Sequence, residues 1–462
     1  MKYVFAGALV LAALLYVAAE CTLTGPPDDG RAHLLWFTDP NPARNVQMRL
    51  FGEQFPDAAA SVDRGDPVRL IVRCATGTGP DVIDVYDQDQ LQTYVQAGIL
   101  LDLTPYAREM GFSPDKTYPA IRDVLAVEGR QYRFPCNVGP NCVVFNRRIF
   151  DDHGAAYPKK DWTWDEFIET GKRIRHSPSR SGETHLPVAN YNNLWMVQDL
   201  LLSHGGRYFS DDGLASRLGS DEAVAAMQMY HDMMHVHRII PTAAEATTMA
   251  GQGGWGTGGI NWFTHGKAAM ILIGRWYVIQ VPNQPGLAPH LGAVQLPHVP
   301  GRPSTGITVC RGAGVNARSP HRRQALEFLQ CLASSAYGRL IVQDGDALPP
   351  NPDLARTGAD LVNPTIPDPE FHQPFIDGMK TTGSVDLSPF IDASQVQRWI
   401  IERIEKVENH VLEPRQAMQG LADEIDHRIR LNLERRGDLR RKFEQVTGRP
   451  WTPDGWRTRQ AH

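Results

Sequence analysis

The stretch Phe263-Thr264-His265-Gly266-Lys267-Ala268-Ala269-Met270-Ile271-Leu272-Ile273-Gly274-Arg275-Trp276 is the part of this chain that says most about its fold. Its pattern predicts a short helix ending near Gly266 and then a buried strand over residues 268–273. Trp276 follows the end of that strand. Open α/β sheets bind ligands at the carboxyl ends of their strands, where an indole ring offers a stacking face. A tryptophan that only packs in the core is the alternative interpretation.

Short motifs of this kind recur in a fixed order along most of the chain. They lie at residues 34–39, 78–83, 91–106, 132–135, 144–147, 163–167, 325–329, 347–351 and 417–425. Together with residues 263–276, they resemble the extracellular solute-binding proteins that serve carbohydrate ABC importers, the maltose-binding-protein-like family. Phe145 is a departure, because the family usually has tyrosine there. The ordered set, rather than any single motif, carries the resemblance.

The resemblance implies an α/β fold of the periplasmic-binding-protein type II kind, with two α/β lobes built from discontinuous segments and joined by a hinge. Strand–helix alternation over residues 34–99 and 142–174 predicts mostly parallel sheets, and the length of the chain predicts more than one domain. The expected division is a signal or lipoprotein-like segment (1–21), a tether (22–32), lobe 1 (33–143 plus 312–366), lobe 2 (144–311 plus 367–445) and a C-terminal tail (446–462).

The beginning of the chain is typical of an exported protein. A basic start is followed by apolar or small residues from Val4 to Ala19, fewer than the about 20 that span a membrane comfortably. Cys21 stands where a lipoprotein signal has its acylated cysteine, although Glu20 replaces the small residue of that motif. A lipidated Cys21, a cleaved signal and an uncleaved anchor remain the alternatives. The expected location is the periplasm or the extracytoplasmic face of the membrane, with a membrane tether.

Several helices are marked by their ends. Thr163 and Glu166 form a capping-box pattern, and helices are also expected over residues 220–237, 322–333 and 394–441, the last one broken at Pro414. Residues 344–374 are rich in proline and glycine and are expected to be irregular.

Candidate ligand-binding residues are the aromatic and polar side chains at strand exits, because sugar sites combine stacking faces with convergent hydrogen-bonding groups. Packing alone is the alternative for each of them. On the first lobe the candidates are Trp36, Thr38, Asp39, Tyr86 and Asp87; on the second they are Asn193, Trp195, Trp255, Arg275, Trp276, Tyr277 and Trp399.

Charge and cysteine content leave two questions open. The net charge of −5 gives no reason to expect nucleic acid, but residues 246–326 contain no Asp or Glu. Arg275 and Arg311 in that stretch favour an acidic sugar as the ligand. Asp39 and Asp87 could instead neutralise these arginines, which would favour a neutral sugar.

The spacing of Cys136 and Cys142 allows a disulfide in an oxidising compartment, with two buried thiols as the alternative.

The sequence contains only weak matches to motifs for cofactor binding, metal binding or catalysis. The glycines of residues 251–256 match a dinucleotide pattern without its strand or acidic residue, and are interpreted as a loop that carries Trp255. His231 and His235 stand at helical spacing, but no third metal ligand is suggested, which favours a solvated helix edge. No catalytic residue, metal or cofactor is expected.

The resemblance therefore implies an exported solute-binding protein without enzymatic activity. It would capture a sugar or oligosaccharide between its lobes, close around it and deliver it to an ABC transporter permease. An extracellular carbohydrate-active enzyme and a sugar-sensing module for a membrane receptor are the alternatives. The implied partners are the carbohydrate, the permease and the membrane, but not nucleic acid.

Overall fold

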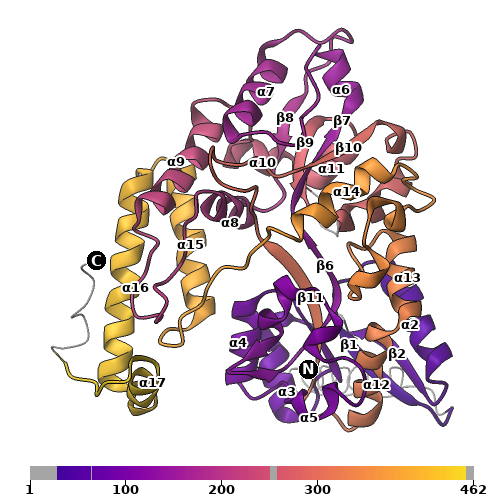
Figure 1. Cartoon of the computed structure of the whole chain (residues 1–462), viewed down its shortest axis with the longest axis vertical. Helices are drawn as coiled ribbons and strands as arrows, with labels where there is room; N and C mark the ends of the chain where they lie inside the picture. The colour runs from indigo at the N-terminus through magenta and orange to yellow at the C-terminus, as the bar shows by residue number, and fades with distance from the viewer. Residues whose placement is uncertain (1–28, 64, 250–257, 454–462) are drawn as a thin grey trace, which may run out of the picture.

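The computed structural model describes residues 29–63, 65–249 and 258–453, which form two α/β lobes (Figure 1). The lower lobe in this view contains the first strands of the chain, and the upper lobe contains its middle part. Strands β6 (Phe134–Pro140) and β11 (Thr308–Val315) run between the two. The chain thus passes from one lobe to the other and back.

The first lobe is built on a five-stranded sheet with the order β2-β1-β3-β11-β6. Buried apolar side chains such as Leu34, Val82 and Phe328 form its core. Besides β6 and β11, its elements are β1 (Ala32–Phe37), α2 (Ala43–Gln54), β2 (Ala58–Asp63), α3 (Leu70–Thr76), β3 (Val82–Val85), α4 (Gln88–Gln96), α5 (Thr104–Ala107), the hairpin β4 (Ala126–Val127) and β5 (Arg130–Gln131), α12 (Arg322–Ala333) and α13 (Ser335–Asp344).

The second lobe is built on a four-stranded sheet with the order β10-β7-β9-β8. Its elements are β7 (Cys142–Asn146), α6 (Arg147–Asp152), α7 (Trp164–His176), β8 (Leu186–Ala189), α8 (Asn193–Ser203), α9 (Asp221–His235), α10 (Ala243–Met249), α11 (Gly259–Thr264), β9 (Ala268–Ile273), β10 (Leu291–Gln295), α14 (Pro369–Gly378), α15 (Ala393–Glu408), α16 (Pro414–Arg435) and α17 (Gly437–Thr447). Helices α15 to α17 form a column beside the lobes (Figure 1).

Both sheets are mixed, so the expectation of mostly parallel sheets is wrong. Strand β1 runs parallel to β2 and β3, and β8 runs parallel to β9. Strand β11 is antiparallel to β3 and β6, and β7 is antiparallel to β9 and β10. The reason is topological: the chain leaves the first lobe through β6 and returns through β11, so these neighbours must run in opposite directions.

Local signals predicted the elements well. All six residues of β9 are buried, as expected, and α11 ends just before the predicted turn at Gly266. The capping box of Thr163 and Glu166 is confirmed, with both reciprocal hydrogen bonds present. Two details differ from expectation. Helix α14 begins inside the segment expected to be irregular, and the late helical region has a second break at Arg436.

The crossings between lobes are short. Strand β6 ends at Pro140 and β7 begins at Cys142, so Asn141 alone separates them. After α13 the chain packs against the second lobe, because Ala355 and Leu361 share a core with Tyr277 of that lobe. The lobe boundaries given above remain a prediction.

The disulfide between Cys136 and Cys142 is not present. Both are free, fully buried thiols, and they lie in β6 and β7, which belong to different sheets. Burial raises the pKa of each thiol well above its ordinary value. The second interpretation, two buried thiols, therefore describes this pair.

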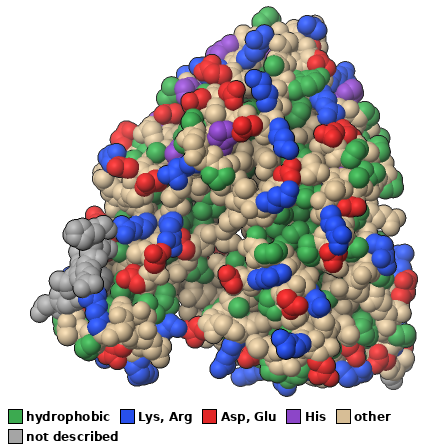
Figure 2. Space-filling model, in the orientation of Figure 1, with side chains coloured by type: hydrophobic (Ala, Val, Ile, Leu, Met, Phe, Trp, Pro, Cys, Tyr) green, Lys and Arg blue, Asp and Glu red, His purple; other side chains and the backbone are tan. Residues whose placement is uncertain are grey.

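Some sequence predictions fall outside the described residues. These are the signal or lipoprotein segment with Cys21, the proposed loop with Trp255 and the end of the C-terminal tail. Among the residues that the structure does describe, no helix is long and apolar enough to cross a membrane. On the face drawn in Figure 2, Lys and Arg are interspersed with Asp and Glu over the described surface, so the charge is mixed there.

Candidate functional site

Three aromatic side chains of the second lobe form a cluster, called here the aromatic cluster: Tyr191, Trp195 and Trp276. The ring of Tyr191 lies 5.3 Å from that of Trp276 and 5.7 Å from that of Trp195, measured between centroids, and both pairs meet edge to face. Tyr191 is 41% exposed, and the two indoles are partly buried. The cluster therefore presents ring surface to solvent while its rings hold one another in place.

Local sequence explains how Trp276 reaches this position. Strand β9 is buried along its whole length, and the chain turns after Ile273 into a 3-10 segment at residues 275–283. A Cβ on Gly274 would lie 2.7 Å from Cδ1 of the Trp276 ring. Because real Cβ atoms do not approach so closely, glycine at this position lets the indole fold back over the strand exit.

The first lobe contributes polar groups that act on this cluster. Asp39 follows β1, and its backbone N–H donates to the hydroxyl of Tyr86, which follows β3. The pKa of Tyr191 is raised first by burial and then by the negative charge of Asp39. Tyr86 and Asp87 of the first lobe also line one cavity with Trp195 of the second, which makes the space between the lobes the candidate ligand site.

Asp39 is kept charged by its neighbours. Burial raises the pKa of its carboxyl group, but the guanidinium groups of Arg44 and Arg311 outweigh this, and the pKa is lowered overall. Arg44 Nε donates to Asp39 at 3.0 Å. A carboxylate that retains some exposure can accept hydrogen bonds from ligand hydroxyl groups, and the Asp39 side chain is 23% exposed.

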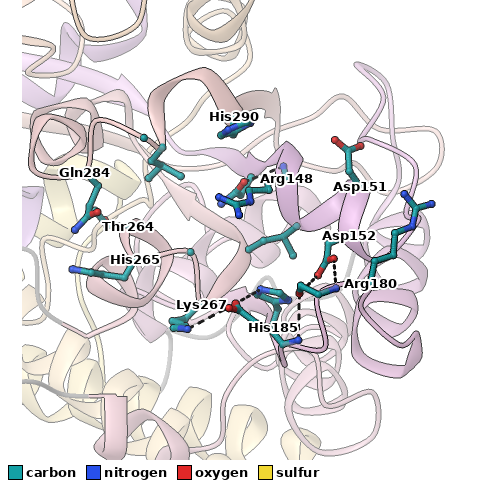
Figure 3. A pocket seen from close by; sticks show the side chains of 17 residues that line it. Arg148, Asp151, Asp152, Arg180, His185, Thr264, His265, Lys267, Gln284 and His290 are labelled. Atoms are coloured by element: carbon teal, nitrogen blue, oxygen red, sulfur yellow. Dashed lines mark hydrogen bonds and ion pairs between the residues drawn. The ribbon is translucent and has the colours of Figure 1, made fainter.

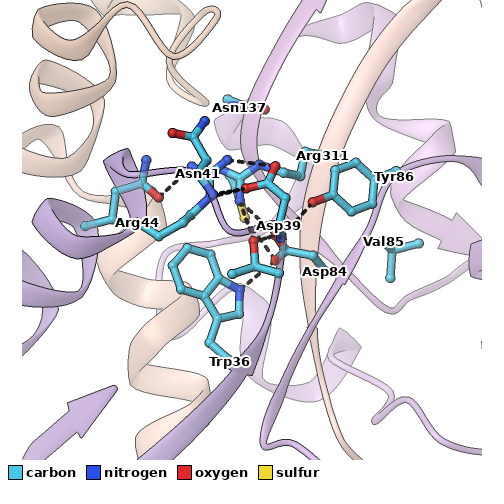
Figure 4. Close-up of polar contacts among 12 residues, drawn as sticks. Trp36, Asp39, Asn41, Arg44, Asp84, Val85, Tyr86, Asn137 and Arg311 are labelled. Carbon is cyan, nitrogen blue, oxygen red and sulfur yellow. Dashed lines mark hydrogen bonds and ion pairs between the residues drawn. The ribbon is translucent and has the colours of Figure 1, made fainter. Parts of the chain in front are cut away.

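Behind Asp39 lies a buried polar network that sequence reasoning did not identify (Figure 4). Asp84 on β3 accepts hydrogen bonds from Trp36 Nε1 at 2.7 Å, Thr38 Oγ1 at 2.5 Å and Arg311 at 2.8 Å. Asp346 accepts from Arg44, Gln47 and Asn137. Asp84 stands in an otherwise apolar strand, Val82–Val85, which was the available signal for a buried partner.

Three predicted ligand contacts are wrong because the side chains are buried. Trp36 and Tyr277 have no exposed surface, so neither offers a ring face. Arg275 is also fully buried and donates to the carbonyl oxygens of Ala347 and Leu361, each at 2.6 Å. A guanidinium engaged in this way fixes chain segments to one another and is not available to grip an acidic ligand.

The remaining candidates lie apart from the aromatic cluster or serve local structure. Asn193 donates to Glu408 at 2.6 Å, and Asp87 caps α4 by accepting from the backbone N–H of Gln90. Trp399 packs against the core of the second lobe with the guanidinium of Arg428 over its ring. Thr38, as described above, donates to Asp84.

A small cavity of about 70 Å³ lies where the lobes approach each other, and its walls include Tyr86, Asp87, Trp195 and Gln198. Asp89 also lines it. Burial, together with the neighbouring Asp87, raises the pKa of Asp89 to about 8. Asp89 lines a cavity with side chains distant in the sequence, among them Gln198, Tyr208 and Gln397, so no local pattern indicated this second carboxyl group.

A much larger hollow of about 610 Å³ lies on the second lobe alone (Figure 3). Arg148, Asp151, Asp152 and Lys267 are among its walls, and its described lining contains no Trp, Tyr or Phe. It lacks both a stacking face and residues of the other lobe, so lobe closure would not enclose a ligand there. The interlobe space is the better candidate.

Asp199 joins the two crossing segments. This fully buried carboxyl group of α8 accepts from Asn141 Nδ2 at 2.9 Å and from the backbone N–H of Ile307 at 2.8 Å. Burial raises its pKa to about 7, against the lowering effect of both hydrogen bonds. The Oδ1 atom of Asn141 has no hydrogen-bond partner, so a neutral group at position 199 can be accommodated by turning that amide.

We expect Asp199→Asn to change the pH dependence of stability. Because the folded pKa lies above the unfolded value, the native state binds the extra proton, and the stability contribution of Asp199 is lost as pH rises toward 7. The variant stays neutral. Its free energy of unfolding, measured by urea titration, should therefore gain roughly 2–3 kcal/mol relative to wild type between pH 5 and pH 8. Parallel pH profiles of the two proteins would refute this.

A family model described as bacterial extracellular solute-binding protein matches residues 51–339. The diacetylchitobiose binding protein DasA of Streptomyces coelicolor is 24% identical over 262 residues, which are 56% of this chain and 57% of that protein. The match thus spans less than two thirds of the curated relative.

Solved structures show the same architecture. An ABC substrate-binding protein of Listeria monocytogenes in complex with cycloalternan superposes with a TM-score of 0.70 at 19% identity, covering 86% of this chain and 98% of that one. A solute-binding protein of Thermotoga lettingae bound with alpha-D-tagatose gives a TM-score of 0.72 at 15% identity, covering 86% and 100%. This likeness confirms the predicted fold class.

Proposed function

Since this chain belongs to the family of bacterial extracellular solute-binding proteins, we propose that it captures a carbohydrate between its lobes and delivers it to an ABC permease. The observation that carries the proposal is the aromatic cluster, whose Trp195 lines a cavity together with Tyr86 and Asp87 of the other lobe. Aromatic faces stack on the apolar faces of sugar rings. The relatives support the class, because their names record diacetylchitobiose, cycloalternan and tagatose as ligands.

The mechanism is closure selected by the ligand. A sugar that stacks on the aromatic cluster and donates hydroxyl hydrogen bonds to Asp39 contacts both lobes only when they are close. Its affinity is therefore higher for the closed form, and binding shifts the population toward that form. The short crossing at Asn141 and the clamp of Asp199 on both crossing segments favour a hinge motion over a sliding one.

An uncharged sugar fits this site better than an acidic one. Arg275 is occupied by backbone carbonyl groups, and Arg311 is paired with Asp84. The first lobe instead offers carboxyl groups with exposed surface, Asp39 and the cavity-lining Asp87, and carboxylates repel anions. We therefore place neutral mono- and oligosaccharides first among the ligand classes.

Membership of this family implies an extracytoplasmic location. A lipid on Cys21 would hold the protein at the membrane beside its permease, and this tether is part of the proposal. It is tested by metabolic labelling with a fatty-acid analogue. Loss of the label in Cys21→Ser supports lipidation, and an unlabelled wild-type protein contradicts it.

A ligand panel tests the proposed function directly. We expect diacetylchitobiose, maltotriose, cycloalternan or another neutral saccharide to raise the melting temperature of the purified protein, and calorimetry to show binding of one molecule per chain. Because the contacts are stacking and neutral hydrogen bonds, the affinity should change little between low and high salt. Uronates should bind more weakly than their neutral counterparts.

Two outcomes would replace this proposal. Appearance of shortened saccharides during the incubation would identify a carbohydrate-active enzyme. Saccharide binding without any association with the permease, while the protein associates with a membrane receptor, would identify a sensing module. Failure of every saccharide class to bind would remove the carbohydrate proposal itself.

A further inference from the structure

Three histidines from distant parts of the sequence meet on the second lobe. His231 and His235 lie one turn apart near the end of α9, and His410 lies in the turn between α15 and α16. The rings of His235 and His410 are 3.9 Å apart between centroids, and those of His231 and His235 are 4.9 Å apart. One ring nitrogen from each lies within 4.8 Å of the others. We call these residues the histidine cluster.

The hydrogen bonds of this cluster leave ring nitrogen atoms available to a ligand. His231 Nδ1 is bonded to Asp232 Oδ1 at 2.9 Å, which leaves Nε2 of the same ring as a lone-pair donor. The Nε2 atom of His235 is buried and has no hydrogen-bond partner. A buried imidazole nitrogen without a partner is costly, and a metal ion is a partner that satisfies it.

We propose that His231, His235 and His410 form a binding site for a divalent transition-metal ion of the zinc type. Zinc takes imidazole nitrogen at about 2.0–2.1 Å, and tetrahedral sites with three histidines keep water in the fourth position. The ligand nitrogens of such a site are about 3.3 Å apart, so small ring rotations convert the present arrangement into a coordinating one. Asp232 is the outer carboxylate that orients a liganding histidine.

The environment of His235 agrees with this assignment. The pKa of His235 is lowered by burial and by the neighbouring His410 and His231. Neutral imidazole is the form that binds metal.

His410 has a left-handed backbone with φ of 55°, which is uncommon outside glycine and turns the chain sharply between α15 and α16.

Metal bound here would connect α9 to the turn after α15. The same region is linked to the aromatic cluster by Glu408, which accepts hydrogen bonds from Tyr230 of α9 and from Asn193, each at 2.6 Å. Asn193 stands two residues from both Tyr191 and Trp195. The ion would therefore stabilise α9 and the turn after α15, the region that Glu408 links to Asn193 beside the aromatic cluster.

A second histidine pair, His153 and His185, needs no such partner. His153 Nε2 and His185 Nδ1 are 3.0 Å apart and share a hydrogen bond, and the other nitrogen of His153 is bonded to the Ser177 carbonyl at 3.0 Å. Because these nitrogens are already satisfied within the protein, this pair is the weaker competitor for metal. It still has to be separated from the histidine cluster by experiment.

The test is calorimetric titration of the full exported protein with Zn²⁺ after treatment with chelator and dialysis. We expect one strong equivalent per chain and a higher melting temperature. His410→Ala and His235→Ala should each weaken Zn²⁺ binding by at least the roughly 10–100-fold that loss of an outer-shell partner costs. Asp232→Asn should weaken it by roughly tenfold. Co²⁺ in place of Zn²⁺ should give the visible absorption of a tetrahedral site.

His237→Ala is the matched control, because it removes a neighbouring histidine outside the cluster and should bind Zn²⁺ as wild type does. Circular dichroism of each variant checks that it is folded. Equal Zn²⁺ binding by wild type and His410→Ala would overturn the proposal. So would loss of the strong equivalent in His185→Ala alone, since the ion would then sit at the other pair. Sugar binding is measured separately, and either proposal can fail without the other.

Discussion

Asp84→Ala should lower the free energy of unfolding by about 3–5 kcal/mol, the cost of leaving a buried charge without its partner. Asp84 is fully buried, and the side chain of Arg311 is 3% exposed. Without the carboxylate, the guanidinium keeps an ion pair with Asp346 at the longer distance of 3.5 Å, and Trp36 Nε1 loses its acceptor. Denaturant unfolding followed by tryptophan fluorescence and by circular dichroism measures the effect.

The control for this experiment is an ion pair of the same residue types on the surface. Asp57 pairs with Arg323, and their side chains are 53% and 62% exposed. Asp57→Ala should lower the free energy of unfolding far less than Asp84→Ala does, since solvent screens an exposed pair. Equal and small effects of the two substitutions would show that the network around Asp84 does not hold the first lobe together.

Trp276→Ala should weaken binding of the saccharide found in the ligand panel by tenfold or more. Loss of the indole removes about 80 Å² of apolar stacking surface from the complex, worth about 2 kcal/mol or roughly thirtyfold in affinity. Tyr191→Ala removes both a ring face and the edge-to-face support of Trp276, so a comparable loss is expected. Calorimetric titration at one temperature and salt concentration measures both.

Trp399→Ala is the matched control, because it deletes the same side chain from the same lobe outside the aromatic cluster. It should bind the saccharide as wild type does, whereas Trp276→Phe should keep part of the affinity because a ring remains. An unchanged dissociation constant in Trp276→Ala, with a normal melting temperature, would remove this residue from the site. Tyr191→Ala would then decide whether the rest of the aromatic cluster binds ligand.

The position of the ligand site at strand exits remains a prediction, whereas the exposure of its individual side chains could not be predicted from the sequence. The exits of β1, β3 and β9 were identified, since the ends of strands follow from local pattern. Trp36 and Trp276 were nevertheless both expected at strand exits. Trp36 lies inside β1 and packs against Phe328, with 4.9 Å between ring centroids, whereas Trp276 follows β9 and is partly open. Tyr191 was missed because it follows β8 (Leu186–Ala189), a short strand that was not predicted from the sequence, and its contact with Trp276 depends on the tertiary structure.

The amino-acid sequence by itself determined the local elements and the family. Capping at Thr163, the buried run of β9 and the limits of α12 depend on residues within a few positions of one another. Tertiary structure alone decided which polar groups meet. Asp84 and Arg311 are separated by 227 positions in the sequence. His410 is likewise far in the sequence from His231 and His235, which it meets in the histidine cluster. Contacts over such distances depend on how the lobes pack, because neither helix periodicity nor strand alternation reaches beyond its own element.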